Sequence, residues 1–265
     1  MKIVVFQGGL GNQLFQYAFY RYLEQQCDIK RLCYIFVENA HNGFEVDKYF
    51  ETSLRPANKL WTLLWWFSDK LHKRGIRFLT SYEDDECPTA RLFVEGYWQH
   101  RRYLHPNLIR FKDIPLDNRN LEIIEQMKDC ESVSIHIRRG DYMLPYFHRI
   151  YGDVCTLAYY QKAIEVVRKQ LPQARFFIFS DDIEWTRNNL IVERAVCIDW
   201  NVGEKSVIDM YMMTYCKANI IANSSFSYWG ARLNVNDHPL VVYPKKWFNA
   251  VFTAPDIFPN IWIGL

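Results

Sequence analysis

Two adjacent arginines, Arg138 and Arg139, are the residues of this chain best suited to chemistry. They follow an apolar run at residues 133–137 and precede Gly140 and Asp141. The carboxyl end of a buried strand is where α/β proteins bind ligands. Two guanidinium groups cannot pair with each other, so they favour an anion with several oxygens, such as a phosphate or diphosphate. An Arg–Asp ion pair within the turn is the structural alternative.

A glycine-rich turn, GGLGNQ at residues 8–13, follows the first predicted strand. Gly9 and Gly11 would let a ligand approach the backbone, and the amides that open the next helix would favour an anion or a polar oxygen. The spacing is not that of a dinucleotide-binding GxGxxG motif, because no acidic residue follows at the required distance. A tight turn that needs a positive φ explains the glycines equally well.

Two neighbouring carboxylates, Asp181 and Asp182, end a predicted strand at residues 175–180. A carboxylate in this position could accept hydrogen bonds from guanine or from a ribose. It could instead cap the predicted helix at residues 183–189. A metal site of the DxD type is the third interpretation, although the two aspartates here are adjacent rather than separated by one residue.

A serine-rich segment, NSSFSYWG at residues 223–230, opens another predicted helix. The hydroxyls of Ser224, Ser225 and Ser227, together with free amides at the helix start, could hold a diphosphate. Capping of the helix by one serine is compatible with that role. No lysine follows at the spacing of a P-loop, which disfavours Walker-type ATP hydrolysis.

Strand and helix patterns alternate along most of the chain, which predicts βαβ units and parallel sheets. A polar, proline-containing segment at residues 113–120 is the predicted link between two halves, residues 1–120 and 121–265. Strands are predicted at 2–7, 32–37, 92–97, 133–137, 175–180, 195–198, 218–222 and 240–243. Helices are predicted at 14–26, 59–73, 122–128, 157–170, 183–189, 206–216 and 225–233.

Two segments of the first half have more than one interpretation. The helix at residues 59–73 is amphipathic, and its apolar side could face the core, a partner or a membrane surface. The acidic run at residues 83–86 has no metal-ligand spacing and is predicted to be a solvated loop.

The bulk composition excludes several classes of protein. Apolar residues make up 49% of the chain and aromatic residues 17%, which supports a packed core and argues against disorder. A formal net charge of +2 gives no support to a nucleic-acid partner. The seven cysteines form no CxxC pair, which is typical of a reducing compartment such as the cytoplasm. The N-terminus lacks the features of a signal peptide, and no apolar run is long enough to span a bilayer.

Four segments in this order and spacing, GGLGNQLFQYAF, HIRRGDY, FSDDIEW and ANSSFSYWGARLN, resemble the α-1,2-fucosyltransferases of glycosyltransferase family 11. The resemblance implies an α/β, GT-B-like fold with two Rossmann-like halves and a cleft between them. It implies inverting, metal-independent transfer of L-fucose from GDP-β-L-fucose to the 2-hydroxyl of a terminal galactose in a glycan. The first half would bind the acceptor and the second the donor, with no further cofactor.

The same resemblance implies roles for individual residues. Arg138 would hold the β-phosphate and neutralise the departing GDP, while Arg139 would support it or pair locally. His136 would lie against the nucleoside, and Asn12 near the fucose and the phosphate. The remaining donor contacts would come from carboxylates that read guanine and from groups that line the diphosphate: Asp181 or Asp182, Ser224, Ser225, Ser227, Gly9 and Gly11.

Several points stay open at this stage. Asp141 is the nearest candidate for the general base, and the alternative is a dissociative reaction with late proton transfer to a phosphate oxygen. Other readings are a fucosyltransferase of another linkage (α-1,6 or O-fucosyl) and a non-catalytic GDP-sugar or glycan-binding module. Bacterial members of the family are cytoplasmic or loosely attached to the membrane, so a peripheral contact at its inner face is also expected. The sequence does not predict an oligomeric state.

Overall fold

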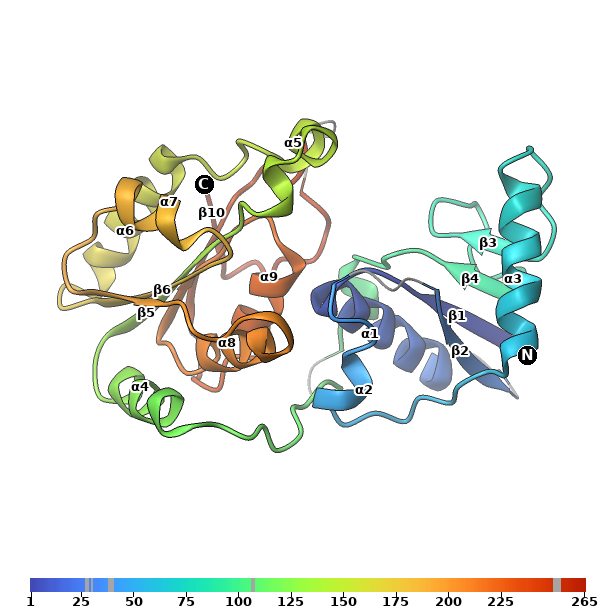
Figure 1. Ribbon diagram of the computed structural model, residues 1–265, viewed down its shortest axis with the longest axis horizontal. Helices are drawn as coiled ribbons and strands as arrows, with labels where there is room; N and C mark the ends of the chain where they lie inside the picture. The colour runs from blue at the N-terminus through green and yellow to red at the C-terminus, as the bar shows by residue number, and fades with distance from the viewer. Residues whose placement is uncertain (27–28, 30, 38–40, 106–107, 250–253) are drawn as a thin grey trace. The chain divides into compact units, whose positions relative to one another are not determined.

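The computed structural model describes residues 1–26, 29, 31–37, 41–105, 108–249 and 254–265 (Figure 1). The chain divides into two compact units, Met1–Asp113 and Ile114–Leu265. In the residues described, each unit holds one parallel sheet, of four strands in the first and six in the second. The predicted α/β class with two Rossmann-like halves is therefore confirmed.

The first unit is built on the sheet β2-β1-β4-β3, in which neighbouring strands are parallel. Strand β1 is central because its apolar side chains are buried on both faces. The strands are β1 (Lys2–Phe6), β2 (Leu32–Phe36), β3 (Thr80–Tyr82) and β4 (Phe93–Glu95). The helices are α1 (Leu10–Gln26), α2 (Val46–Tyr49), α3 (Lys59–His72) and the 3₁₀ helix η1 (Arg101–Tyr103).

One local prediction in this unit was wrong, and a second was incomplete. Helix α1 begins at Leu10, four residues earlier than expected, because the carbonyl of Gly9 already accepts the amides of Asn12 and Gln13 at 2.9 and 3.1 Å. The acidic run is not simply a solvated loop. Oε2 of Glu83 accepts the amides of Tyr97 and Trp98, both at 2.8 Å, and so fixes the loop after β4.

The second unit is built on the sheet β10-β9-β8-β5-β6-β7, again with parallel neighbours. Its strands are β5 (Ser132–Ile137), β6 (Arg175–Ser180), β7 (Ala195–Ile198), β8 (Ala218–Ile220), β9 (Leu240–Tyr243) and β10 (Ile263–Gly264). Its helices are α4 (Asn118–Lys128), α5 (Pro145–Tyr151), α6 (Leu157–Gln170), α7 (Ile183–Asn189), α8 (Ser206–Met213) and α9 (Ser225–Arg232), with the 3₁₀ helices η2 (Asp141–Met143) and η3 (Gly203–Lys205).

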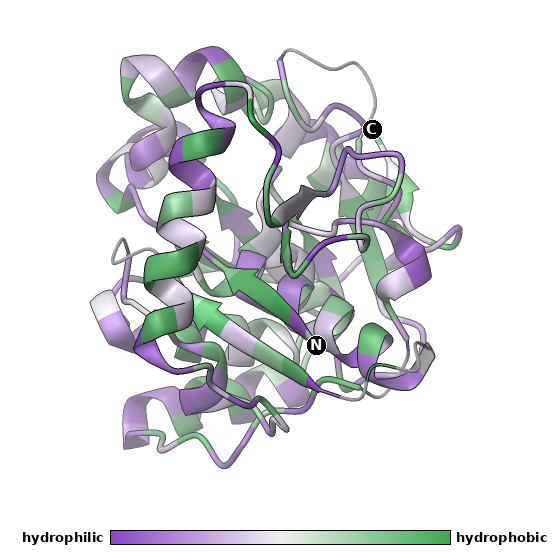
Figure 2. Cartoon of the chain, turned by 90° about the vertical axis from the view of Figure 1, so that its right-hand side faces the viewer, coloured by the Kyte–Doolittle hydropathy of each residue, from purple (hydrophilic) through white to green (hydrophobic). Residues whose placement is uncertain are grey.

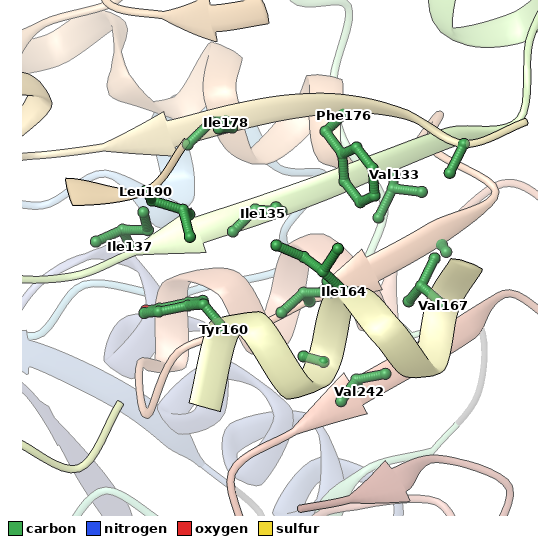
Figure 3. Close-up of a cluster of buried hydrophobic side chains, with 14 residues drawn as sticks. Val133, Ile135, Ile137, Tyr160, Ile164, Val167, Phe176, Ile178, Leu190 and Val242 are labelled. Atoms are coloured by element: carbon green, nitrogen blue, oxygen red, sulfur yellow. The ribbon is translucent and has the colours of Figure 1, made fainter. Parts of the chain in front are cut away.

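The core of the second unit fixes the strand that carries the arginines. Every residue of β5 is buried, and helix α6 packs along it through Tyr160, Ile164 and Val167 (Figure 3). These side chains meet Ile135 of β5 and Val242 of β9 in one apolar cluster. Such packing leaves the end of β5 little freedom to move, so residues just past Ile137 have a defined position.

The strand order also marks where a ligand should bind. From β5 the chain moves outward through β6 to β7, and it then returns to the other side of β5 with β8, β9 and β10. The reversal lies between β5 and β8, and in open parallel sheets ligands bind at the carboxyl ends of the strands at such a point. Arg138 follows β5 there, and Asn223 follows β8.

Candidate active site

Arg138 leaves the end of β5 and pairs with two carboxylates. Its Nη1 lies 2.9 Å from Oδ2 of Asp181, and its Nη2 lies 2.8 Å from Oδ1 of Asp141. The Arg–Asp ion pair within the turn, which was the structural alternative to an anion-binding site, is therefore present. A guanidinium carries about five N–H donors, so two carboxylate contacts orient Arg138 and still leave donors for a ligand.

Arg139 is fixed by a second carboxylate and by an aromatic ring. Its Nε donates to Oδ2 of Asp182 at 3.0 Å, and its guanidinium lies 3.9 Å from the centre of the Trp185 ring. Asp182 also caps α7, where its Oδ1 accepts the amide of Trp185 at 3.1 Å. The predicted helix cap is thus confirmed at Asp182, and the same residue braces an arginine.

Asp181 connects the two arginines. Besides its ion pair with Arg138, its Oδ1 accepts the backbone amide of Arg139 at 2.8 Å. The cluster of two guanidinium groups and three carboxylates has no excess of positive charge. An anion at this site would therefore be held by oriented donors rather than by net charge.

Gly140 provides the room that this arrangement needs. A Cβ atom placed on Gly140 would lie 2.6 Å from Oδ2 of Asp181, the oxygen that pairs with Arg138. In Gly140→Ala we expect the carboxylate to turn away and lose this ion pair. Loss of such a partly buried charged contact costs about 1.5 kcal/mol, so kcat/KM should fall about tenfold. The melting temperature should change little, and a cooperative loss of folding instead would show that the glycine serves the fold.

His136 lies on β5 beneath the arginines and is only 6% exposed. Burial lowers its pKa to about 4; nearby Asp181 opposes this shift and nearby Arg138 adds to it. The ring is therefore neutral at pH 7, and it lies 5.5 Å from the ring of Phe226 at the start of α9. Its Nδ1 has no hydrogen-bond partner within the described residues.

The lowered pKa of His136 predicts a pH effect on stability. Between pH 6.5 and about 4 the unfolded chain binds a proton at this residue that the folded chain does not, so the free energy of unfolding should fall as the pH is lowered. The slope is at most about 1.4 kcal/mol per pH unit. Denaturant titrations of the parent and of His136→Gln across this range measure the difference.

The parent must be compared with His136→Gln because a buried acid elsewhere in the chain changes the free energy of unfolding with pH in the opposite direction. Burial raises the pKa of Asp209 to about 7, so its contribution to stability falls as the pH rises. This contribution is common to both proteins and cancels in the difference. Equal slopes for parent and variant would contradict the assignment to His136.

The serine segment is only partly available to a ligand. Ser224 caps α9 by accepting the amide of Phe226 at 3.3 Å, which confirms the predicted cap. Ser227 is fully buried, and its hydroxyl donates to the carbonyl of Ser224 at 3.4 Å. Ser225 is half-buried and makes no side-chain hydrogen bond to another described residue. Of the three serines, Ser225 is therefore the one with an uncommitted hydroxyl.

Asn223 joins the loops on the two sides of the strand reversal. Its carbonyl accepts the hydroxyl of Tyr142 at 3.0 Å, and its side-chain amide donates to the carbonyls of Tyr151 and Trp247 at 3.2 and 3.0 Å. The segment after the arginines is thus tied to the segment that opens α9. Arg138, Arg139 and the serine segment belong to one local structure, as predicted.

A pocket of about 150 Å³ opens beside the arginines, within the second unit. Most of its wall could not be predicted. Helix α5, whose last residue Tyr151 lines the pocket, was not predicted either, although Pro145 at the first position of that helix is a typical start signal. The lining residues are Arg138, Arg139, Tyr142, Met143, Tyr151, Gly152, Asp153, Cys155, Thr156, Leu157, Trp185 and Asn223.

The glycine turn forms a separate group in the first unit. It follows β1, and the strand reversal of that sheet lies between β1 and β4. Gly8 has a φ of +76°, so a tight turn does require glycine there. Gly9 ends the turn, Gly11 is buried in the first turn of α1, and Oδ1 of Asn12 accepts Nε2 of Gln99 at 3.3 Å.

Gln13 is a residue of this group that the sequence analysis did not single out. Its Nε2 donates to the carbonyls of Gly8 and Gly43, both at 2.8 Å, and its Oε1 accepts the amides of Glu45 and Val46. A fully buried glutamine thus ties the glycine turn to the loop before α2. The signal in the sequence was a polar residue within an otherwise apolar helical stretch, because a polar side chain that becomes buried needs hydrogen-bond partners.

In the part of the chain that the structure describes, the His, Cys, Asp and Glu side chains form no group of three or more that could hold a metal ion. Among the helices described, none has both the length and the apolar character needed to cross a bilayer.

Comparison with known proteins places this chain in a family. The profile of the family described as "Glycosyl transferase family 11" matches residues 1–265. An alpha-1,2-colitosyltransferase of Escherichia coli is 32% identical over 100% of this chain and 99% of its own length. The O-antigen biosynthesis glycosyltransferase WbnK of Escherichia coli is 29% identical over 97% and 98%. The galactoside alpha-(1,2)-fucosyltransferase 1 of Sus scrofa is 28% identical over 50% of this chain and 38% of that protein.

Proposed function

Since this chain belongs to glycosyl transferase family 11, we propose that it transfers L-fucose from GDP-β-L-fucose to the 2-hydroxyl of a terminal galactose in a glycan. The observation that carries the proposal is the braced arginine pair. Arg138 and Arg139 stand at the strand reversal of a parallel sheet, and each keeps N–H donors beyond those its carboxylate partners use. Oriented donors of this kind suit the diphosphate of a nucleotide sugar.

The chemistry follows from the charges that develop in the reaction. As the bond between the sugar and the β-phosphate breaks, its electron pair goes to the phosphate oxygen and positive charge appears on the sugar ring. Arg138 would stabilise the new phosphate charge, with Arg139 and the start of α9 in support. The galactose 2-hydroxyl would attack from the opposite face, which inverts the anomeric centre. This scheme routes no step through a metal, because the oriented N–H donors of the guanidinium groups stabilise the phosphate charge.

For the proton of the attacking hydroxyl we favour late loss, after the sugar–phosphate bond has broken, with solvent carrying the proton to a phosphate oxygen of the departing GDP. Asp141 is occupied by Arg138 at 2.8 Å, which suits a brace better than a general base. Asp181 and Asp182 likewise hold the arginines, and a further contact of either with guanine stays a prediction. Of the serines, Ser225 is the proposed diphosphate contact.

The two units would divide the substrates between them. We assign most donor contacts to the second unit, which carries the arginines, and the acceptor to the first. The loops expected to select the acceptor are residues 39–56 and 80–89; Asn39 and Ala40 lie outside the described residues. Gly9, Gly11 and Asn12 are proposed to contact the donor from the glycine turn.

The cytoplasm is the proposed compartment. Cysteines that the structure describes are free thiols, which favours a reducing environment. These are Cys33, Cys87, Cys130, Cys155, Cys197 and Cys216; Cys27 lies outside the described residues.

Colitosyl transfer is the second candidate, because a relative that matches the whole chain is named an alpha-1,2-colitosyltransferase. Colitose differs from fucose by the loss of one hydroxyl, at carbon 3. A site that hydrogen-bonds this hydroxyl rejects the deoxy sugar strongly, whereas an apolar site discriminates weakly. Both donors would use the same arginine pair.

The test is a transfer assay with EDTA present, GDP-fucose or GDP-colitose as donor, and a panel of β-galactosides as acceptors. With GDP-fucose we expect a fucosylated galactoside whose NMR spectrum shows an α-1,2 linkage. Preference for colitose would select the second candidate. An α-1,6 linkage or O-fucosylation of a peptide would replace the proposed linkage, and GDP binding without turnover on any acceptor would indicate a binding module.

A further inference from the structure

Helix α3 of the first unit has two apolar faces, and only one of them belongs to the core. Trp61, Leu64 and Trp65 pack against the cluster formed by β1, β2 and β4, which confirms the core packing considered for this helix. The other face is exposed. Leu60, Leu63 and Trp66 are 70, 67 and 67% exposed, and Phe67 is 54% exposed.

The inner face fixes the orientation of the helix. Nε1 of Trp65 donates to Oε2 of Glu95 at 2.9 Å, and the hydroxyl of Ser68 contacts that of Thr80 at 3.0 Å and accepts the amide of Leu79 at 3.1 Å. These polar contacts are buried or partly buried and sit on one side of α3. The exposed side chains therefore cannot be buried by rotating the helix on its own sheet.

The exposed surface continues past the end of the helix. Ile76 and Phe78 are 53 and 45% exposed, and the Phe67 and Phe78 rings meet edge to face at 6.3 Å. We name this surface the α3 outer face and define it by six apolar residues: Leu60, Leu63, Trp66, Phe67, Ile76 and Phe78. Figure 2, which looks onto the side of the molecule where α3 lies, shows hydrophobic and hydrophilic turns alternating along the helix.

The unpaired charges of α3 and of the turn after it are positive. At 100° per residue, Lys59 and Lys70 fall on the same side of the helix as Leu63 and Trp66, and Arg74 lies in the turn that follows the helix. All three basic residues are exposed, and their side chains form no ion pair with any residue that the structure describes. Asp69, the acidic residue of α3, lies toward the flank and pairs with Lys73 at 2.7 Å.

From this geometry we propose that the α3 outer face docks on an anionic lipid membrane. A partner with a negatively charged surface over an apolar interior matches both features of the face, because tryptophan, phenylalanine and leucine enter the interfacial region while lysine and arginine contact lipid headgroups. Long basic side chains can cover apolar surface with their stems and keep their charge in the headgroup layer. The protein lies on the membrane, and α3 does not cross it.

The test is vesicle flotation of the full chain. Vesicles of phosphatidylcholine with phosphatidylglycerol should bind the protein at least tenfold better than vesicles of phosphatidylcholine alone, and high salt should weaken binding. The double variant Trp66→Ser, Phe67→Ser should lose binding at least tenfold, as should Lys70→Glu, Arg74→Glu. The matched control Ile191→Ser, Val235→Ser removes two apolar side chains that are 90 and 62% exposed in the second unit, and it should bind like the parent.

Three outcomes overturn the proposal. Binding to neither kind of vesicle removes it directly, and equal loss in the control variant would show non-specific adsorption. If light scattering shows that the parent is a dimer which Trp66→Ser, Phe67→Ser converts to a monomer, the face is a contact between copies instead. The charge variant keeps the test valid if the serine variant does not fold, since substitutions of exposed lysine and arginine rarely affect folding.

Discussion

Replacing Arg138 by alanine should lower kcat about 10²- to 10³-fold, the largest effect we expect from any single substitution in this chain. Arg138 is the arginine held by two carboxylates, at 2.9 and 2.8 Å, at the strand reversal of the second sheet. Loss of one oriented donor to a charge that develops in the transition state costs about 2.7–4 kcal/mol. Steady-state kinetics with GDP-fucose and the best galactoside measure the loss.

Two further variants show whether the effect belongs to the site. Arg138→Lys keeps the charge but loses the planar fork, so it should recover little of the activity. Arg187→Ala is the matched control, because Arg187 pairs with Asp199 at 2.6 Å in the same unit but does not line the pocket. If Arg187→Ala and Arg138→Ala lose equal activity, the role assigned to Arg138 fails.

Replacing Asp181 by alanine should reduce kcat/KM about ten- to a hundredfold. The carboxylate orients the Arg138 guanidinium and also accepts the backbone amide of Arg139 at 2.8 Å. Without it, a partly buried cation and an amide both lose their partner, and each such loss costs about 1–3 kcal/mol. The same kinetic assay, together with a melting curve, separates lost activity from lost folding.

The variant Asp181→Asn separates the two functions of the carboxylate, which are the ion pair with Arg138 and the hydrogen bond from the amide of Arg139. Asp181→Asn can still accept the amide of Arg139 but no longer attracts Arg138, so its activity should fall between those of the parent and the alanine variant. Asp199→Ala, which breaks the ion pair with Arg187, is the control for loss of a carboxylate elsewhere in the unit. Full activity in Asp181→Ala would mean that Arg138 does not depend on this brace.

The elements that carry the site could be predicted where one local signal dominates. The run of β-branched apolar residues before Arg138, at Val133, Ile135 and Ile137, predicts a buried parallel strand, and β5 is one, with every residue buried. The Asp182 cap of α7 and the Ser224 cap of α9 could be predicted as alternatives, since a short polar side chain before a helical pattern is a strong signal. In both cases the determining contacts lie within a few residues of each other in the chain.

Contacts between distant segments could not be predicted in this way. The pairing of Arg138 with Asp181 joins the residues that directly follow β5 and β6, and the stacking of Arg139 on Trp185 depends on where α7 starts relative to β5. Strand β3 has only three residues, and its pairing with β4 rather than its own composition makes it a strand. The outer face of α3 was visible as a pattern, but its exposure required the structure.

The most direct test of the central claim, that Arg138 holds the diphosphate of the donor, is calorimetric titration of the parent and of Arg138→Ala with GDP and with GMP. The parent should bind GDP more tightly than GMP, and Arg138→Ala should lose most of this preference while its affinity for GMP stays nearly the same. Loss of a charged hydrogen bond to phosphate corresponds to about tenfold or more in Kd for GDP. Undiminished binding of GDP by Arg138→Ala, or an equal loss for both nucleotides, would contradict this claim.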